Sequence, residues 1–598
     1  MTLTPIPLTT LARRLFGELA CDAPSVLEVP RKKLWLGEPG LDLGVRHHGR
    51  RAATPIGPAA GPHTQLAQNI VAAWLAGARI IELKTVQILD DLVIPRPCID
   101  MATVGFNVEW SQELRLAESA VEYVKAAMLV AMLRRRLGLG DEAGETLFDL
   151  SVGYDLAGIR SEPVQRFLDA MRDARPLVEQ LRAELPRELG ALLDPEPPTT
   201  IARSVTLSTF HGCPPGELEA IARWLMQERG LDVTIKLNPT LLGKARLLAL
   251  LHDRLGYTDL KVPDSAIESD ATWEEVTGIV SRLRGVARGL GRGFGIKLTN
   301  TLVVENHRDF FPSSERVMYL SGAPLHALAL ALLSDFREAF GPELPVSLSA
   351  GVDRHNVADA VALGLVPVTV CSDLLQPGGY ARAAGYLAEL AARMRAVGAS
   401  DIPGFIRATG ADLVAAARER AAAAAADPRY ARAHNARPPK KLARTLATFD
   451  CTSCDKCVPV CPNTAIFGLE VARAGAAAHQ IGILADACND CGNCDVFCPE
   501  HGGPNLSKPR FHLTRAGYLA EAPRDGVVVE RIRDALFATG RLGGRELQVA
   551  LDGPCEPGLA ADLQALARAA VHVAVQHGRA DTWIAAHLRA AEQKEIGA

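Results

Sequence analysis

The sequence predicts an α/β protein in which a (β/α)8 TIM barrel is followed by a compact cysteine-rich domain and a small α/β tail. Two observations predict this. Between residues 46 and 398, short apolar runs alternate with amphipathic helical stretches, a pattern typical of parallel strands joined by helical crossovers. Eight of the 13 cysteines then fall into two tight quartets. The number of strand–helix units favours a closed barrel over an open sheet.

Length and composition limit the classes of protein to which this chain can belong. The 598 residues carry a formal net charge of −4 and are 48% hydrophobic, which fits a globular protein of at least two domains and argues against nucleic-acid binding. Residues 1–45 form a short extension with one helix-like stretch, Leu8–Leu19, and no apolar core of signal-peptide length. No run approaches the roughly 20 apolar residues of a membrane span, so we expect a cytoplasmic protein that does not enter a membrane.

The barrel is predicted over residues 46–398. Amphipathic helices such as Pro215–Glu228 and Leu325–Phe340 lie between several of its strand-like runs. The expected strands are Arg79–Leu83, Leu147–Val152, Val205–Ser208, Val233–Leu237, Gly295–Leu298, Val346–Ser349 and Val366–Val370. In such barrels the chemistry takes place at the C-terminal ends of the strands. The turns that follow these runs are therefore the candidate site.

A change of composition predicts a helical linker over residues 399–445. Ala415–Ala426 is nearly all alanine and ends at Asp427-Pro428. The stretch Ala436–Arg444 that follows is basic and contains proline. A solvated linker is the simpler interpretation of this stretch, and docking of an acidic partner is the alternative.

The tail, residues 506–598, is predicted to be a small α/β unit. Strands are expected at Gly526–Glu530 and Leu547–Leu551, and a helix at Ala560–Ala570. No catalytic pattern is visible in the tail, and we expect Cys555 to be a structural residue.

The cysteine quartets lie within residues 446–505 and have the spacing of a bacterial-type two-cluster ferredoxin domain. Each reads Cys-x2-Cys-x2-Cys-x3-Cys-Pro, in which three thiolates hold one cubane and the fourth reaches the other cluster. One [4Fe–4S] cluster is therefore predicted on Cys451, Cys454, Cys457 and Cys498, and the second on Cys488, Cys491, Cys494 and Cys461. Zinc sites are the alternative, but their ligands usually come in pairs. Tight metal spacing fits a reducing compartment, and it predicts electron transfer.

Several turns of the barrel suit a flavin. Thr54–Gly61 is a small-residue turn in which backbone can lie against a flat ring. Lys84 and Lys236 stand at the ends of separate strands, where an ammonium group can neutralise negative charge on a reduced flavin. Ser349–Val352 and Val370–Asp373 follow the last two strands, where such barrels usually bind a phosphate.

Eight segments follow one another in a familiar order: Thr54–Gly61, Leu83–Thr85, Gly105–Glu109, His211–Pro215, Lys236–Thr240, Thr299–Thr301, Ser321-Gly322 and Ala350-Gly351. Together they resemble the FMN-binding barrel of dihydropyrimidine and dihydroorotate dehydrogenases. The match is closer still to proteins described as selenate reductase subunits, in which Gly57–Asn69 and His211–Pro215 look almost unchanged. The resemblance covers about residues 50–395.

The resemblance implies FMN in the barrel and a planar substrate above it. The implied cofactor-binding residues are Ala60, Gly61, Lys84, Thr85, Lys236, Ser321, Gly322, Gly351, Cys371 and Ser372. The implied substrate-binding residues are Asn107, Glu109, Asn300 and Thr301. Ordinary turn residues are the alternative for the two asparagines.

Cys213 matches the general acid of that family, and His211 is close enough in sequence to tune or replace it. Reducing a polarised C=C bond needs a hydride on one carbon, which FMN supplies, and a proton on the other, which a thiol can supply. A buried structural thiol is the alternative for Cys213.

Two departures bear on substrate and partner. The related dehydrogenases have Asn where this chain has Phe210, so pyrimidines themselves are in doubt. The chain has no strand followed by GxGxxG, because Gly289–Gly295 precedes a strand. Electrons must therefore pass to or from a separate protein, a ferredoxin or an NAD(P)H-flavoprotein subunit. Related barrels are often dimers, which makes a homodimer an open expectation.

The first hypothesis is an oxidoreductase acting on a CH–CH or CH–NH group of a small N-heterocycle of purine or pyrimidine type, with FMN and two [4Fe–4S] clusters. The second is an electron-transfer subunit of a larger complex, for example with a molybdenum hydroxylase. The third is an imine reductase similar to glutamate synthase. Selenate reduction normally requires a metal-oxo centre, and no ligand set for one is visible in the sequence.

Overall fold

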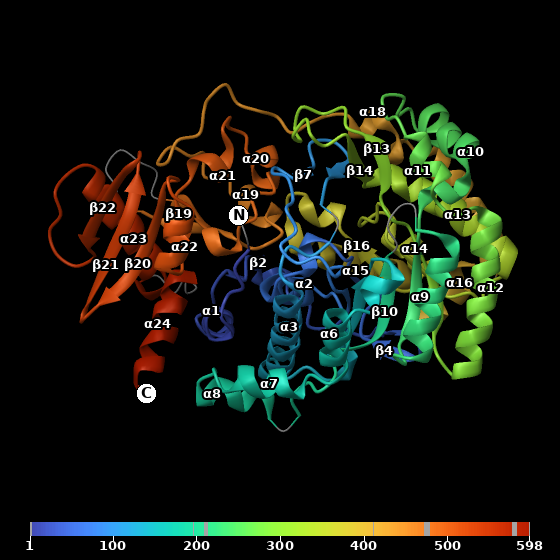
Figure 1. Cartoon of the computed structure of the whole chain (residues 1–598), viewed down its shortest axis with the longest axis horizontal. Helices are drawn as coiled ribbons and strands as arrows, with labels where there is room; N and C mark the ends of the chain where they lie inside the picture. Colours follow the sequence, from blue (N-terminus) through green and yellow to red (C-terminus); the bar gives the residue numbers. More distant parts are fainter. Residues whose placement is uncertain are drawn as a thin grey trace.

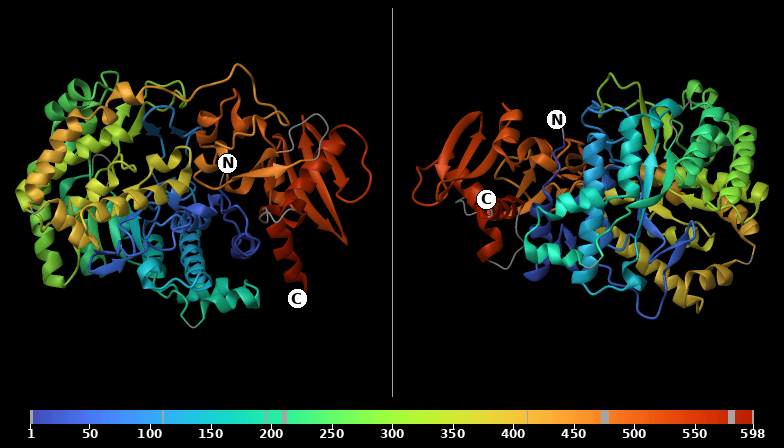
Figure 2. Two further views of the ribbon diagram at one scale, coloured as in Figure 1. Left: turned by 180° about the vertical axis from the view of Figure 1, so that it is seen from behind. Right: turned by 60° about the horizontal axis from the view of Figure 1, so that its bottom comes forward.

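The computed structural model describes residues 3–109, 111–194, 196–208, 213–410, 412–471, 479–576 and 583–596 (Figure 1). A large barrel occupies one side of the molecule, and the C-terminal sheet lies beside it (Figures 1 and 2). In the described part of the chain, no helix is long and apolar enough to cross a membrane.

Eight parallel strands form the barrel and pair in chain order. They are β5 (Ile56–Pro58), β6 (Ile80–Glu82), β9 (Leu147–Val152), β10 (Ala202–Ser208), β11 (Asp232–Leu237), β12 (Phe294–Leu298), β15 (Val346–Leu348) and β16 (Val368–Val370). The ring is closed where the Arg79 N–H donates to the Ile56 carbonyl at 3.0 Å. The predicted (β/α)8 barrel is confirmed. The first strand, β5, lies within Thr54–Gly61, the segment interpreted as a turn from the sequence.

Helices cover the outside of the barrel because their apolar faces pack on the strands. The long ones are α2 (Ala67–Leu75), α3 (Leu116–Arg136), α6 (Glu162–Arg172), α9 (Pro215–Gln227), α12 (Trp273–Leu290), α13 (Ala323–Phe340) and α15 (Arg382–Ala396). Local signals set their ends. Thr272 caps α12 by accepting from the Glu275 N–H, and Gly291, at φ +63°, terminates it.

A four-stranded antiparallel sheet lies over the C-terminal edge of the barrel. It combines two insertions, one after β6 and one after β12. Its strands, in the order in which they pair, are β13 (Leu302–Glu305), β14 (Val317–Ser321), β8 (Gly105–Asn107) and β7 (Ile99–Asp100). This sheet was not predicted from the sequence, because its strands are short and its central pairing, β8 with β14, joins residues about 200 apart.

The region predicted as a linker is largely part of the barrel wall. Its helices α16 (Ile402–Thr409) and α17 (Leu413–Ala426) contain buried residues, and α17 packs along α13. Ala417 and Ala424 form the buried side of α17, and Arg418 pairs with Glu338 of α13 at 2.6 Å. The short helix α18 (Arg432–Asn435) then leads into the extended basic stretch.

The cysteine-rich domain and the tail share one six-stranded sheet. Its strands, in the order in which they pair, are β17 (Ile466–Glu470), β18 (His479–Leu484), β19 (Arg510–His512), β20 (Gly526–Ile532), β21 (Ala535–Leu542) and β22 (Arg545–Ala550). Helices α23 (Leu559–Gln576) and α24 (Trp583–Ile596) follow. Trp583 of α24 lies under the guanidinium of Arg14 in the N-terminal helix α1 (Leu8–Ala20), at 4.1 Å from the ring centre. The tail is therefore continuous with the domain that carries the cysteines.

Candidate functional site

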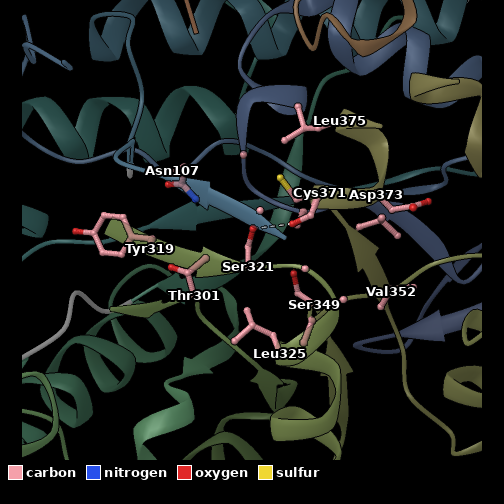
Figure 3. A pocket seen from close by; sticks show the side chains of 18 of the residues that line it. Asn107, Thr301, Tyr319, Ser321, Leu325, Ser349, Val352, Cys371, Asp373 and Leu375 are labelled. Carbon is pink, nitrogen blue, oxygen red and sulfur yellow. Dashed lines mark hydrogen bonds between the residues drawn. The ribbon is translucent and has the colours of Figure 1, made fainter. Parts of the chain in front are cut away.

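A cavity of about 930 Å³ opens at the C-terminal edge of the barrel. Each of the eight barrel strands, or the turn after it, contributes to its lining, as (β/α)8 architecture predicts. The four-stranded sheet forms a wall, with Asn107 of β8 and Tyr319 of β14 facing the space (Figure 3). His434, Asn435 and Arg437, which follow α17, complete the lining.

All fourteen predicted cofactor- and substrate-binding residues line this cavity. They are Ala60, Gly61, Lys84, Thr85, Asn107, Glu109, Lys236, Asn300, Thr301, Ser321, Gly322, Gly351, Cys371 and Ser372. They come from segments up to about 300 residues apart in sequence, so the fold brings the whole set together. Whether they bind what the resemblance implies stays a prediction.

Lysines and carboxylates lie in and next to the lining of the cavity, at a side that we call its floor: Lys84, Glu109 and Lys236 are lining residues, and Glu82 and Lys297 are buried beside them. Lys84 forms an ion pair with Glu109, and Lys297 forms one with Glu82. Glu82 also accepts the N–H of Ala60 at 3.0 Å. Burial on its own raises the pKa of Glu82, but Lys297 and Lys236 outweigh it and lower that pKa. Glu82 is therefore held as a carboxylate.

Lys236 is the third lysine of this floor, opposite Lys297 in the register of β11 and β12. Its pKa is lowered by burial first, and the nearby positive charges of Lys297 and Lys84 add to this. Within the described residues its ammonium group has no hydrogen-bond partner. Glu82 is its nearest opposite charge and is already paired with Lys297. A half-buried cation that faces an open cavity is a natural contact for a polar or anionic edge of a ligand.

Serine and glycine residues shape one end of the cavity beside α13. Ser372 donates to the Ser321 hydroxyl at 2.9 Å (Figure 3). Gly351 has φ +52°, and a Cβ built there would lie 2.5 Å from the Gly322 carbonyl oxygen, so only glycine fits. α13 begins at Ala323, directly after Gly322, and the first amides of a helix have no partner within it. This end has the hydroxyl and amide donors that a phosphate needs.

Asn300, one of the predicted substrate-binding residues, is held in place by hydrogen bonds to Asn238 and Ser208. The Asn300 amide donates to the Asn238 side-chain oxygen at 2.7 Å, and its own side-chain oxygen lies 3.4 Å from the Ser208 hydroxyl. Thr301 and Tyr319 also line the cavity, on the same side of it as Asn107 (Figure 3). Fixed amide and hydroxyl groups of this kind recognise hydrogen-bonding edges of a planar ligand.

Cys213, the predicted acid, is buried but is not among the described residues that line the cavity. Burial raises the pKa of its thiol to about 12, and the carboxylates of Glu217, Asp270 and Asp155 add to the shift. The thiol therefore stays protonated. His211 lies outside the described residues, so its position relative to Cys213 stays a prediction.

The eight cysteines of the quartets lie in two groups. The thiol of Cys457 lies near those of Cys451, Cys454 and Cys498, whose charges add to burial in raising its pKa. The thiol of Cys494 likewise lies near those of Cys491, Cys488 and Cys461, which add to the effects of burial and Asp495 on its pKa. These are the two sets of four predicted from the spacing. We call them the first and the second cysteine group.

The second group touches the wall of the cavity. The Cys491 carbonyl accepts the backbone N–H groups of Cys98 at 3.1 Å and Ile99 at 3.0 Å, and Ile99 itself lines the cavity. On the other side, the Asn493 amide donates to the carbonyl of Leu375, another lining residue, at 2.9 Å. The first group is more peripheral, and its Cys454 is exposed.

Sequence reasoning missed Glu82, Lys297 and these wall contacts. A signal existed for Lys297: Ile296-Lys297-Leu298 repeats the Ile235-Lys236-Leu237 triplet of the neighbouring strand. Since the two triplets pair in register, both lysines point to the same side. The wall contacts had no such signal, because they join residues 118 apart at Leu375 and almost 400 apart at Cys98 and Ile99.

Comparison with known proteins supplies the family. Residues 28–426 match the family model "Oxidoreductase YgfK, N-terminal TIM-barrel domain". YgfK of Escherichia coli K12, inferred to be an oxidoreductase, is 40% identical over 405 residues, and so is its counterpart in strain O157:H7. These matches cover 64% of this chain but 39% of the relatives, so the chain spans well under half of their length.

Two further likenesses are weaker. A ketoisovalerate oxidoreductase subunit, VorC, from Methanothermobacter marburgensis is 29% identical over 62 residues, which cover 10% of this chain and 76% of that protein. A dihydroorotate dehydrogenase structure from Eimeria tenella superposes with a TM-score of 0.39 at 17% identity, covering 66% of this chain and 96% of that one.

Proposed function

Because the chain belongs to the YgfK N-terminal TIM-barrel oxidoreductase family, we propose that it is an iron–sulfur flavoprotein. It reduces or oxidises an activated double bond of a small N-heterocycle of purine or pyrimidine type. FMN lies in the barrel cavity, and electrons are exchanged with a separate ferredoxin or NAD(P)H-flavoprotein through two [4Fe–4S] clusters. The observation that carries this proposal is the contact of the second cysteine group with the cavity wall.

The residues of the cavity fit FMN. Gly351 and Gly61 leave space that a side chain would fill, since a Cβ at Gly61 would lie 2.9 Å from the Cys371 sulfur. Ser321, Ser372 and the first amides of α13 would hold the phosphate. Lys236 would face the electron-rich edge of the ring system. When bound, FMN supplies hydride chemistry and also accepts electrons one at a time.

The cysteine groups fit two [4Fe–4S] clusters. Each has four thiols near one another, the donor set that cubanes require. Zinc, the alternative from the sequence, usually takes its ligands as pairs rather than as quartets. Clusters pass single electrons. With Cys454 at the surface and Cys491 at the cavity wall, the two groups suit a path from an external partner to the barrel.

Substrate recognition is assigned to polar groups that are already held in place. Asn107, Asn300 and Thr301 would hold a planar ring by its amide-like edges. Glu109 is paired with Lys84 and so presents a carboxylate to ring N–H groups. Because burial raises the pKa of the Cys213 thiol to about 12, the thiol is protonated at neutral pH. This suits a general acid that donates a proton to carbon, and it does not suit a general base.

One observation favours a second function. Cys213 is not part of the described cavity lining, and an electron-transfer subunit that only relays electrons through FMN would need no acid. In that case a partner such as a molybdenum hydroxylase performs the substrate chemistry. The barrel would still carry FMN.

The test uses protein purified anaerobically as the full chain. Acid-released flavin is identified by chromatography, and iron and sulfide are counted. The proposal predicts FMN near one per chain with about eight iron. The reduced protein is then mixed with candidate heterocycles in the absence of any partner. Stoichiometric reoxidation supports the enzyme, and reoxidation only by a protein partner supports the relay. Iron without flavin after reconstitution would contradict both.

A further inference from the structure

We propose that the tail supplies each cluster with its own buried cation, Lys508 for the first cysteine group and Arg510 for the second. These cations raise the reduction potentials of the two clusters independently. The inference rests on the proposed function, since it concerns clusters that the cysteine groups would hold. It gives the tail, in which the sequence shows no chemistry, a part in electron transfer.

The two cations reach different groups from one short segment. Lys508 and Arg510 lie two residues apart around the start of β19, which pairs with β18 on one side and β20 on the other. In extended chain, residues two apart point to the same face. Both side chains are almost fully buried, at 4% and 1% exposure for the residues. A buried cation is expensive unless it serves a partner, so both must have one.

Arg510 reaches the second group directly. Its Nη1 lies 3.7 Å from the Cys488 sulfur, 3.0 Å from the Asn505 side-chain oxygen and 3.3 Å from Asp490. The other edge of the guanidinium pairs with Glu521: Nε donates to one carboxylate oxygen at 2.9 Å, and Nη2 donates to the other at 3.2 Å. The bidentate pair fixes the guanidinium plane. Arg510 is therefore positioned to donate an N–H to the sulfur of Cys488.

Lys508 serves the first group in a different way. Its Nζ donates to the carbonyls of Ala447 and Thr448 at 2.9 and 3.0 Å, and lies 3.5 Å from the Gln480 side-chain oxygen. These hydrogen-bond partners are neutral. The buried carboxylate of Glu500 also acts on the ammonium, but it is itself paired with Arg444, so it balances the charge of Lys508 only in part. The thiols of Cys451, Cys457 and Cys498 are among the charges that act on it.

The physical effect follows from the charge of the cluster. Each cluster gains one electron on reduction and becomes more negative by one unit, while its thiolate ligands stay bound. A nearby cation or a hydrogen bond to a ligand sulfur stabilises the more negative state and raises the potential. Carboxylates partly balance Arg510, so its directed N–H is the larger effect. For Lys508 the charge itself is the larger effect.

This difference gives opposite expectations for conservative changes. Arg510→Lys keeps a positive charge but loses the planar fork that reaches Cys488 while bound to Glu521. It should lower the potential of the second cluster. Lys508→Arg keeps the charge beside the first group and should leave its potential nearly unchanged, whereas Lys508→Met should lower it.

The experiment is a potentiometric titration of the full-length reconstituted protein, followed by EPR of the reduced clusters. Cys454→Ser changes an exposed ligand of the first group and so identifies which midpoint belongs to that cluster. We expect Lys508→Met to lower the midpoint potential of the first cluster by about 59 mV. At a fixed potential, the ratio of reduced to oxidised first cluster then falls about tenfold. Arg510→Lys should do the same to the second cluster only. Arg515→Gln, an exposed arginine of the tail paired with Glu530, should shift neither.

Loss of Arg510 alone leaves Glu521 buried and can prevent folding. The double variant Arg510→Met/Glu521→Met removes both charges together, which buried pairs tolerate well. Equal iron content with unchanged midpoints in this variant and in Lys508→Met would overturn the inference, and so would equal shifts of both clusters in each variant. A wild-type protein without iron would instead overturn the proposed function itself.

Discussion

At the scale of single residues, the cavity combines paired and unpaired charges. Lys84 and Lys297 have carboxylate partners in Glu109 and Glu82. Lys236 instead faces the cavity with a pKa lowered by burial. Such a cation gains most from a ligand that supplies an electron-rich edge. The assignment of Lys236 to the flavin therefore has an energetic reason beyond its position on a strand.

Replacing Lys236 tests that assignment. Lys236→Met should weaken FMN binding by tenfold or more, because a hydrogen bond to a charged group is worth about 1.5–3 kcal/mol. Binding to flavin-free protein is followed by quenching of flavin fluorescence. The matched control is Lys244→Met, which changes an exposed lysine paired with Asp264. Equal affinity in Lys236→Met and wild type would remove Lys236 from the site.

The role of Gly351 at the phosphate end of the cavity is tested by comparing two glycine-to-alanine variants. Gly351→Ala places a Cβ 2.5 Å from the Gly322 oxygen at φ +52°, so it should displace the phosphate end and abolish measurable flavin retention. Gly341 has a similar φ of +69° but open space around it. Gly341→Ala should cost about 1 kcal/mol of unfolding free energy and leave flavin binding intact. Loss of flavin in both variants would point to backbone strain alone.

Replacing Cys213 distinguishes the enzyme hypothesis from the electron-relay hypothesis. Cys213→Ala should keep FMN and the clusters but lower turnover on a heterocycle by about 10²–10⁴-fold, the usual worth of a positioned acid. Cys21→Ala, at an exposed cysteine, is the control. Stopped-flow reoxidation of the reduced flavin measures the step. Full turnover without Cys213 would exclude it as the acid.

At the scale of elements, strand prediction succeeded where burial leaves a continuous apolar run. The runs at Leu147–Val152 and Val233–Leu237 are strands because both their faces are covered in a parallel barrel. β5 lies in a segment whose sequence predicts a turn, since Ile56–Pro58 is short and flanked by small residues. Similarly, β7 has only two residues and pairs with its near neighbour β8, and β8 in turn pairs with β14, about 200 residues further along the chain, so no sequence pattern marks this sheet.

β19 is the element on which the cysteine-rich domain depends most. A chain that ends after residue 508 keeps all eight predicted ligands, but it loses β19, which pairs with β18 at Ile483–Arg510 and Leu484–Phe511. We expect its iron content to fall from about eight to four or fewer. Removing residues 583–598 takes away only α24 and should keep the iron. Full iron in the longer deletion would show that the quartets need no support from the tail.

At the scale of the whole molecule, three parts predicted separately lie in an order that suits the proposed electron path. The cavity, the second cysteine group and the first cysteine group follow one another from the barrel to the surface. The grouping of the eight cysteines could be predicted from their spacing, and their role as cluster ligands stays a prediction. The contact between Cys491 and the cavity wall could not, because no sequence pattern encodes a contact across almost 400 residues.

Buried histidines should make the molecule sensitive to acid. Burial, with nearby positive groups, lowers the pKa of His47 and His63 to about 3 and that of His512 to about 4. Their unfolded value is about 6.5, so unfolding takes up protons as the pH falls. Stability is complete above about pH 6.5 and is lost progressively toward pH 4, by up to about 3 kcal/mol for each histidine.

Thermal unfolding of the flavin- and iron-free protein at several pH values checks this dependence. The midpoint temperature should fall steadily between about pH 6.5 and pH 5. His512→Phe should flatten the curve, whereas His355→Gln, at an exposed histidine, should not. A midpoint that does not change over this range would mean that these histidines titrate alike in both states.

The central claim is that electrons entering at the clusters reach a flavin in the cavity. It is tested most directly by anaerobic rapid mixing of the oxidised holoprotein with a one-electron reductant, while flavin absorbance is recorded. The claim predicts that the flavin bleaches in the wild type, and that Cys494→Ala, which removes a ligand of the second cluster only, slows bleaching at least a hundredfold while FMN stays bound. Bleaching at the wild-type rate in that variant would contradict the path.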